Sequence, residues 1–159
     1  MPKSKKPTIY LETSVISAYF DFKKQDSSRK KQTRKFFKFE LPKYLPFISE
    51  IVIQELTATK STQDRQMLLN LIQKIPILPF SETAKKLRDI YMAANLVPQV
   101  KIDDAGHLAV AVVNNIDIIL SWNYGHIANY FVQEKVNAIN KLHYYPKLII
   151  DFPAKFLTK

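Results

Sequence analysis

The stretch Thr8-Ile9-Tyr10-Leu11-Glu12 predicts a short buried strand over Thr8–Leu11 that is followed directly by a carboxylate. Longer segments with helical spacing separate this run from four further apolar runs. Such alternation is typical of βαβ units, so the chain predicts an α/β fold with a mostly parallel sheet of about five strands, covered by helices on both faces. The four further strands are expected at Leu45–Ile48, Ile77–Leu78, Asp117–Ser121 and Leu148–Ile150.

The helices are predicted from apolar periodicity together with capping side chains. Ser49 and Ser81 are the expected N-caps of two helices, and Ser61 with Asp64 resembles a capping box. The expected helices are Thr13–Phe20, 27–40, 50–58, 62–74, 82–95, 103–115 and a segment within 124–140.

The composition favours one globular domain over residues 1–159, with residues 1–7 as a flexible basic tail. The absence of cysteine excludes a disulfide scaffold, a thiolate zinc site and a cysteine nucleophile. Only Gly106 and Gly125 occur as glycines, which excludes the glycine-rich phosphate loops of nucleotide-binding proteins. No apolar run approaches the roughly 20 residues that span a bilayer. We therefore expect a cytoplasmic protein without a membrane partner.

Positive charge is in excess and is unevenly distributed. The chain has 24 basic and 14 acidic residues, a formal net charge of +10. Such an excess favours a polyanionic partner, because surface Lys and Arg displace counterions from phosphates, although it also serves solubility. The segment 23–38 holds eight basic residues against one acidic residue. The expected RNA-binding residues on its helix are Arg29, Lys30, Arg34 and Lys35, with the tail at Lys3–Lys6 as a second grip.

Four oxygen-bearing side chains are placed to meet at one edge of the predicted sheet. Glu12 and Asn123 directly follow strands, whereas Glu55 and Asp104 lie on helices that pack beside them. In open parallel sheets, sites lie beyond the carboxyl ends of the strands, at the point where the strand order reverses. Each side chain also has an ordinary structural interpretation, such as a helix cap, a turn residue or a surface ion pair. Their shared placement is what indicates a site.

Asp104 gives the sharpest of these signals. It lies on the apolar stripe of its helix with Leu108, Ala111 and Val112, where a carboxylate is costly unless it is paired. Asp103 is expected to take the capping role, which leaves Asp104 for another task.

Carboxylates without cysteine, and with few histidines, suit a hard cation with oxygen ligands, namely Mg²⁺ or Mn²⁺. We therefore expect Glu12, Glu55 and Asp104 as metal ligands, with Asn123 as a fourth catalytic residue that orients a water. A metal held in this way lowers the pKa of water and stabilises in-line attack on phosphorus.

At these residues the sequence resembles the PIN domains of VapC-like toxins. The resemblance implies a PIN-like three-layer αβα sandwich with a five-stranded parallel sheet, an acidic metal site and a metal-dependent ribonuclease, the toxin of a type II toxin–antitoxin pair. It also implies a cognate antitoxin partner and a homodimer. The matching stretches are Ile9-Tyr10-Leu11-Glu12-Thr13-Ser14, Gln54-Glu55-Leu56, Asp104-Ala105-Gly106-His107-Leu108-Ala109 and Leu120-Ser121-Trp122-Asn123-Tyr124-Gly125-His126-Ile127, which together cover about residues 8–130.

Two positions depart from the common form of the family. PIN domains usually carry Asp where this chain has Glu12, and often Asp where it has Asn123, although one branch resembles the present form. Glu12 reaches further by one methylene, while the neutral Asn123 attracts a cation less strongly. A weaker metal site is expected, and the alternative stays open that the chain is a PIN-like RNA-binding module without metal-dependent cleavage.

Three neighbours of these residues are candidates for a supporting role. Thr13 and Ser14 are expected to hydrogen-bond a metal-bound water or a phosphate, or simply to cap the following helix. His107, one turn after Asp104, is expected to contact that carboxylate or to be a satisfied structural histidine.

Two other interpretations are weighed against the nuclease. A phospho-receiver needs an acidic pair after its first strand and a lysine after a later strand, and Glu12 stands alone here. An antitoxin segment that docks an arginine on the carboxylates would regulate the nuclease rather than replace it.

Overall fold

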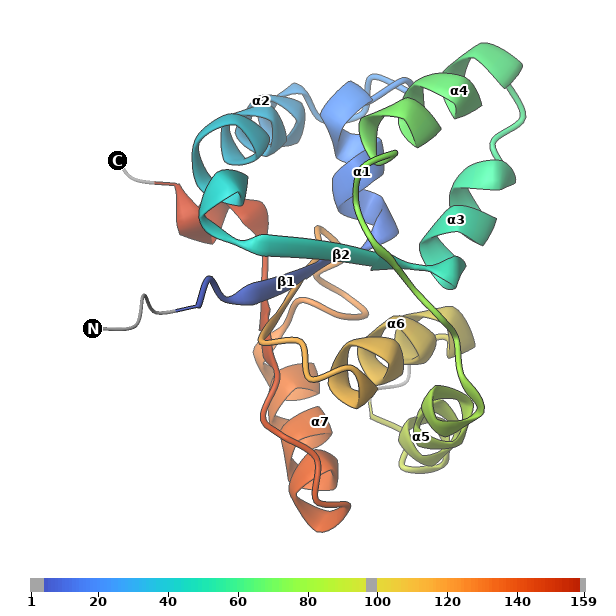
Figure 1. Cartoon of the computed structure of the whole chain (residues 1–159), viewed down its shortest axis with the longest axis vertical. Coiled ribbons are helices and arrows are strands. Elements are labelled where there is room, and N and C mark those ends of the chain that lie inside the picture. The colour runs from blue at the N-terminus through green and yellow to red at the C-terminus, as the bar shows by residue number, and fades with distance from the viewer. Residues whose placement is uncertain (1–4, 97–99, 158–159) are drawn as a thin grey trace.

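The computed structural model describes residues 5–96 and 100–157, which form a five-stranded sheet with helices on both faces (Figure 1). Every pair of neighbouring strands is parallel, in the order β3-β2-β1-β4-β5. The predicted parallel sheet of about five strands is therefore confirmed. The strands are β1 Thr8–Leu11, β2 Leu45–Ser49, β3 Ile77–Leu78, β4 Ile118–Leu120 and β5 Ile149–Asp151.

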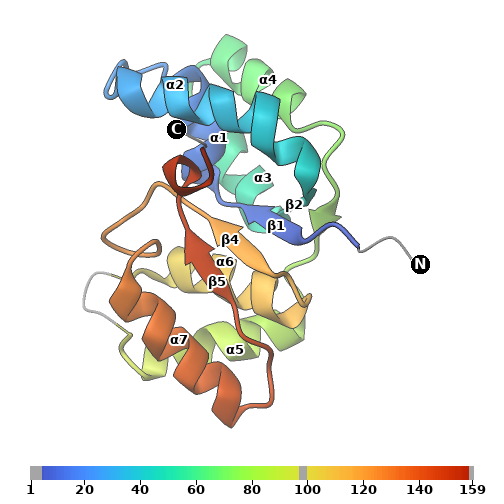
Figure 2. The same ribbon diagram turned by 90° about the vertical axis from the view of Figure 1, so that its left-hand side faces the viewer.

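The helices form the two outer layers of an αβα sandwich. Helices α1, α2 and α4 lie on one side of the sheet, and α5, α6 and α7 lie on the other (Figures 1 and 2). Helix α3 follows β2 and contacts both α1 and α6, so it lies at the carboxyl end of the sheet. Their bounds are α1 Thr13–Phe20, α2 Ser27–Lys35, α3 Glu50–Thr57, α4 Thr62–Leu71, α5 Glu82–Ala93, α6 Ile102–Val113 and α7 Tyr130–Leu142.

The strand order excludes the phospho-receiver. Receivers have the strand order 2-1-3-4-5, in which the order of the strands reverses between the first and third strands. Here β1 lies between β2 and β4, so the reversal falls between β1 and β4. The carboxyl ends of these two strands therefore flank the position where a parallel sheet presents its site.

The core continues from the sheet into α6. Ile9, Leu11, Ile119 and Leu120 are fully buried on the two central strands. Helix α6 is buried at every position from Asp104 to Val112, as expected of a helix that is hydrophobic on nearly all sides. Because α6 is enclosed, any polar side chain on it needs a partner inside the protein.

Local signals predicted several elements to the residue. The bounds of β1, β3 and α1 are as expected, and Ser49, Ser61 and Ser81 accept the backbone N–H of Ile51, Asp64 and Ala84 as N-caps.

Other predicted bounds differ in detail. The segment 27–40 is helical as expected, but it changes from α-helix to π-helix at Phe36–Glu40, and a 3₁₀ turn follows at Leu41–Lys43. Helix α4 ends at Leu71 rather than near 74. Helix α7 begins at Tyr130, inside the expected segment, because the side chain of Asn129 caps it by accepting the N–H of Val132, but it ends at Leu142, beyond that segment.

No helix in the described part of the chain is long and apolar enough to cross a membrane. Within the expected tail of residues 1–7, residues 5–7 are exposed and residues 1–4 lie outside the described ranges, so the flexible tail stays a prediction.

Candidate active site

The candidate site lies at the carboxyl ends of β1 and β4. Glu12 follows β1 directly, and its backbone N–H donates to the carbonyl oxygen of Leu120 at 3.0 Å, which extends the pairing of the two strands by one residue. Ser121 and Asn123 follow β4. The predicted convergence of Glu12 and Asn123 at one edge of the sheet is therefore present.

Three donors hold the carboxylate of Glu12, which is only 6% exposed. Its Oε1 accepts the hydroxyls of Ser14 at 2.5 Å and Ser121 at 2.6 Å, and its Oε2 accepts the backbone N–H of Ser14 at 3.1 Å. Glu12 is thereby also the N-cap of α1. Ser14 hydrogen-bonds the carboxylate itself, and its hydroxyl also accepts the N–H of Trp122 at 2.8 Å.

Glu55 projects from α3 and is held at a single oxygen. Its Oε1 accepts the hydroxyl of Thr13 at 3.0 Å and lies 2.5 Å from Nε2 of His107 on α6. The other ring nitrogen of His107, Nδ1, lies 2.6 Å from the hydroxyl of Tyr10. Of the two alternatives expected for His107, hydrogen-bond contact with Asp104 is absent, and the imidazole is instead a buried histidine with both nitrogens hydrogen-bonded, to Tyr10 and Glu55.

Opposite charge outweighs burial in this pair. Burial favours the neutral form of each group, but the hydrogen bond and the charge attraction between them act in the other direction. As a result the pKa of Glu55 is lowered and the pKa of His107 is raised. Glu55 is thus kept ionised, with 34% of its side chain exposed.

Asp104 lies in the first turn of α6 with 12% of its side chain exposed. Its Oδ2 accepts the backbone N–H of Lys101 at 3.0 Å and lies 3.1 Å from Nδ1 of His126, while Nδ2 of Asn123 lies 3.4 Å from Oδ1. The prediction that Asp103 caps this helix was wrong. The helix begins at Ile102, so Asp104 is the third helical residue and reaches back to the N-cap backbone, whereas Asp103 is exposed.

The donor types of this site fit a hard divalent cation. The negative charges of Glu12, Glu55 and Asp104 all raise the pKa of His107, although only Glu55 is in hydrogen-bond contact with its imidazole. Oxygen ligands of this kind are those that Mg²⁺ and Mn²⁺ prefer. The side chains are not positioned as a finished metal site, however, because residues 5–96 and 100–157 contain no group of three or more Asp, Glu, His or Cys side chains close enough to hold one ion.

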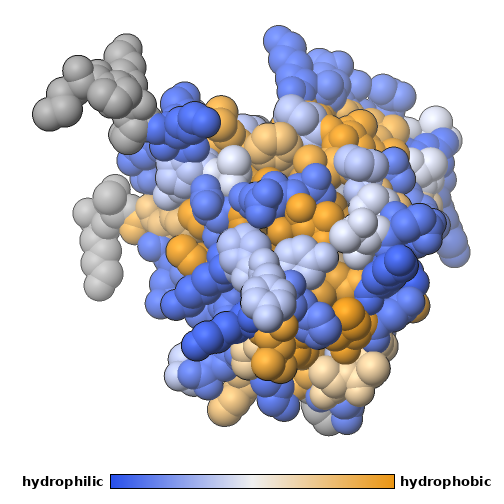
Figure 3. Space-filling view, turned by 60° about the horizontal axis from the view of Figure 1, so that its bottom comes forward, coloured by the Kyte–Doolittle hydropathy of each residue, from blue (hydrophilic) through white to orange (hydrophobic). Residues whose placement is uncertain are grey.

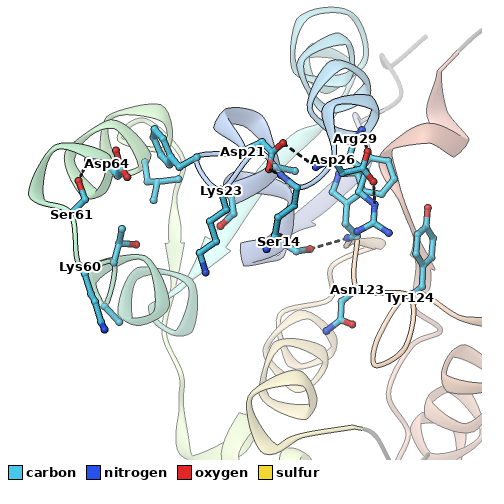
Figure 4. A pocket seen from close by; sticks show the side chains of 18 of the residues that line it. Ser14, Asp21, Lys23, Asp26, Arg29, Lys60, Ser61, Asp64, Asn123 and Tyr124 are labelled. Atoms are coloured by element: carbon cyan, nitrogen blue, oxygen red, sulfur yellow. Dashed lines mark hydrogen bonds and ion pairs between the residues drawn. The ribbon is translucent and has the colours of Figure 1, made fainter.

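A groove of about 1260 Å³ runs away from the site between α1, α2 and the loop before α4 (Figure 4). Ser14 and Asn123 line the end that borders the carboxylates, and Lys23, Lys60 and Arg29 line its walls. The same groove is also lined by acidic side chains, so its charge is mixed; these are Asp21, Asp26 and Asp64.

The four predicted RNA-binding residues differ in their surroundings. The guanidinium of Arg29 stacks 5.3 Å from the ring centre of Trp122 and 5.1 Å from that of Tyr124, and Arg34 donates to the carbonyl of Tyr19 at 2.8 Å. Lys30 is half-buried and Lys35 is exposed. Arg29 therefore has a packing contact with the loop that carries Asn123, in addition to its place in the groove.

Sequence reasoning missed Ser121, His126 and Tyr10. Ser121 and His126 both follow β4, at the edge where Asn123 was already expected, so that placement was a usable signal. Tyr10 is fully buried in β1. A buried tyrosine hydroxyl needs a hydrogen-bond partner, although the sequence gives no sign of which partner it finds.

Comparison with solved structures shows that the fold is the PIN-like fold of toxin–antitoxin structures. The chain is similar to a chain of DNA-bound VapBC from Salmonella typhimurium, with 15% identity, a TM-score of 0.59 and coverage of 92% of this chain and 98% of the other. FitAcB from Neisseria gonorrhoeae gives 13% identity, a TM-score of 0.61 and coverage of 91% and 97%. VapBC2 from Rickettsia felis, bound to a promoter DNA fragment, gives 18% identity, a TM-score of 0.53 and coverage of 91% of this chain and 98% of the other.

At these identities the likeness concerns the fold alone. No model of a known protein family matches the sequence, and no curated protein matches it.

Proposed function

We propose that this chain is a metal-dependent ribonuclease that hydrolyses RNA phosphodiester bonds and acts as the toxin of a type II toxin–antitoxin pair. The observation that carries the proposal is that Glu55 hydrogen-bonds both Thr13, the residue after Glu12, and His107, one turn after Asp104, at the strand-order reversal of a PIN-like sheet. A structural role alone gives little reason to place three acidic side chains at one end of the sheet, because each carboxylate removed from water costs free energy.

In this proposal Glu12, Glu55 and Asp104 hold Mg²⁺ or Mn²⁺. The bound ion would supply a nucleophilic water and stabilise the charge that develops on the phosphate. The protein's own hydrogen bonds keep the carboxylates in place: Ser14 and Ser121 fix Glu12, and Thr13 and His107 fix Glu55 at Oε1. Asn123 donates toward Asp104 at the mouth of the groove, which suits a role in orienting a water beside that carboxylate.

The net charge of +10 supports RNA as the substrate, and we propose that Arg29, Lys30, Arg34 and Lys35 contact its phosphates.

The structural neighbours support a cognate antitoxin, because the structures they come from are described as VapBC and FitAcB.

A homodimer is also proposed. Exposed apolar side chains such as Phe131 and Leu142 of α7 are available for such contacts, and Figure 3 shows apolar patches among hydrophilic side chains on one face of the molecule. A cytoplasmic location, where RNA and antitoxin are both present, belongs to the same proposal.

The experiment that tests the proposal compares Asp104→Asn with Asp103→Asn in an RNA-cleavage assay with Mg²⁺ or Mn²⁺. The two residues are adjacent in α6, but Asp103 is exposed and Asp104 borders the site. Asparagine at position 104 keeps a side-chain oxygen for the N–H of Lys101, so folding should be retained. We expect cleavage to fall by about 100-fold or more for Asp104→Asn, in the range for loss of a group that a metal site depends on, and to stay near wild type for Asp103→Asn. Equal activity of both variants would refute the assignment.

A second candidate is an RNA-binding module with the same fold and no metal-dependent cleavage. The neutral Asn123 and the lack of a ready three-ligand group in residues 5–96 and 100–157 favour it. Calorimetric titration with Mn²⁺ separates the two candidates: the nuclease gives saturable binding that Asp104→Asn weakens, and the module binds RNA without saturable Mn²⁺ binding.

A further inference from the structure

A chain of side-chain hydrogen bonds runs through the core to Glu55. Oγ of Ser49 lies 2.7 Å from the hydroxyl of Tyr10, which lies 2.6 Å from Nδ1 of His107, and Nε2 of His107 lies 2.5 Å from Oε1 of Glu55. Ser49 and Tyr10 are fully buried and His107 is 1% exposed. This series of hydrogen bonds links the ends of β1 and β2 to α6 and then to α3, and of its four residues only Glu55 reaches solvent.

The direction of donation at its functional end is fixed. A glutamate is ionised near neutral pH and can then only accept, so Nε2 of His107, 2.5 Å from Oε1 of Glu55, carries a hydrogen and donates it. If the imidazole is neutral, Nδ1 is an acceptor and the hydroxyl of Tyr10 donates to it. If the imidazole is charged, Nδ1 donates to Tyr10 and Tyr10 donates to Ser49. Tyr10 satisfies His107 in both cases, because a hydroxyl both donates and accepts.

We propose that Tyr10 is a positioning residue for the site: it holds the ring orientation of His107, and through His107 it fixes which oxygen of Glu55 faces a bound metal. This inference rests on the proposed function in taking Glu55 as a ligand. Thr13 and His107 both bond Oε1 of Glu55, so the fixed orientation leaves Oε2 for the ion. A histidine held by an outer partner in this way is a recurring device for orienting the ligands of metals.

The hydroxyl of Tyr10 can be removed with little change in packing. The rings of Tyr10 and His107 meet edge to face, with centres 5.7 Å apart, and phenylalanine keeps that contact. Tyr10→Phe therefore removes one oxygen and leaves Nδ1 of His107 without its partner. Tyr91→Phe is the matched control, because Tyr91 is also fully buried and donates one hydrogen bond, to Oδ1 of Asn140.

The test reads two properties of the full chain. The ¹⁵N spectrum of the His107 imidazole, recorded without metal, reports the hydrogen bonding of each ring nitrogen, and Mn²⁺ titration by calorimetry reports the affinity of the site. We expect Tyr10→Phe to shift the imidazole resonances away from the wild-type pattern and to weaken Mn²⁺ binding by about tenfold, the lower range for loss of an outer partner. Tyr91→Phe should change neither.

A double-variant cycle separates positioning from general damage. If Tyr10 acts through His107, then Tyr10→Phe should have no further effect on Mn²⁺ binding in a His107→Gln background, because the amide nitrogen of glutamine can donate to Glu55 without Tyr10. Additive losses, or an unchanged imidazole spectrum in Tyr10→Phe, would overturn the proposal. If Tyr10→Phe does not fold, Ser49→Gly removes the hydroxyl at the far end of the hydrogen-bond series, at an N-cap position that tolerates glycine, and should shift the same resonances. An unshifted imidazole spectrum in Ser49→Gly would overturn the proposal equally.

Failure of the proposed function gives a different result. A wild-type chain that binds no Mn²⁺ refutes the metal site, while the imidazole spectrum of Tyr10→Phe still decides whether Tyr10 controls His107.

Discussion

Nε2 of His107 and Oε1 of Glu55 lie 2.5 Å apart although the two residues are 52 positions apart in the chain. The contact joins α6 to α3, so it depends on how closely these helices approach each other. Gly106, next to His107, packs against α3: a Cβ added there would be 2.9 Å from Cδ1 of Ile51, so that side chain would have to shift. The small residue at position 106 therefore favours the close approach of the two helices beside the hydrogen bond at position 107.

The first prediction concerns this helix contact. Gly106→Val should lower the free energy of unfolding by about 1–3 kcal/mol, because overpacking a filled core forces neighbouring side chains to shift. Gly125→Val is the control, since no atom lies within 4 Å of a Cβ built at Gly125. Urea denaturation followed by circular dichroism measures both. Equal midpoints for the two variants would show that the helices can separate at no cost.

The second prediction concerns the hydroxyl that holds Glu12. Ser121 is fully buried, donates to Oε1 of Glu12 and accepts the N–H of Asn123 at 2.9 Å. Ser121→Ala should lower the free energy of unfolding by about 1–3 kcal/mol, because it leaves a buried donor without a partner and removes one donor from a carboxylate. Ser28→Ala, an exposed position in the first turn of α2, should change it by less than about 0.5 kcal/mol. Thermal unfolding of the two variants, recorded side by side, decides the matter; a Ser121→Ala protein as stable as Ser28→Ala contradicts the role given to Ser121.

The third prediction concerns alkaline pH and a tyrosine away from the site. Burial raises the pKa of the Tyr91 hydroxyl above its ordinary value, despite its hydrogen bond to Asn140. The folded state therefore keeps a proton that the unfolded chain loses above about pH 10. The stability that comes from this difference is complete below pH 10 and is lost as the pH rises further. Tyr91→Phe should be less stable than wild type at pH 8, but its stability should fall less steeply between pH 10 and 11.

The measurement is the free energy of unfolding in urea at several pH values, with wild type and Tyr91→Phe compared at each. The difference in slope should approach about 1.4 kcal/mol per pH unit for one proton. Parallel curves would mean that Tyr91 ionises as readily in the folded protein as in the unfolded chain.

The sequence predicted elements well where the signal is local. A run such as Thr8–Leu11, or a serine one residue before a helix, determines its own conformation through contacts within a few residues. Local signals failed at the start of α6. The sequence favoured Asp103 as the capping residue, but because α6 begins at Ile102, the side chain of Asp104 is the one that caps it.

The partners within the site were harder to predict than its members. Strand ends and helix faces predicted that Glu12, Glu55, Asp104 and Asn123 would gather at one edge. The contacts of Tyr10 with His107 and of Ser121 with Glu12 join residues 97 and 109 positions apart. Contacts over such separations follow from the register of parallel strands and the approach of α3 to α6, which no local pattern encodes.

The extra methylene of Glu12 is explained by these contacts. It allows the carboxylate to fold back to the N–H and hydroxyl of Ser14 while it also reaches Ser121. The glutamate thus caps α1 and borders the site with the same side chain.

Whether Glu12, Glu55 and Asp104 hold a metal can be decided by anomalous scattering from a crystal of the wild-type chain soaked in Mn²⁺, because the signal locates and counts the metal ions. We expect at least one strong peak within about 2–2.5 Å of carboxylate oxygens from these three residues, the distance range of hard cations to oxygen ligands. The peak should disappear in Asp104→Asn and persist in Asp103→Asn. A map without a peak among these carboxylates, from a protein that still cleaves RNA, would refute the metal site.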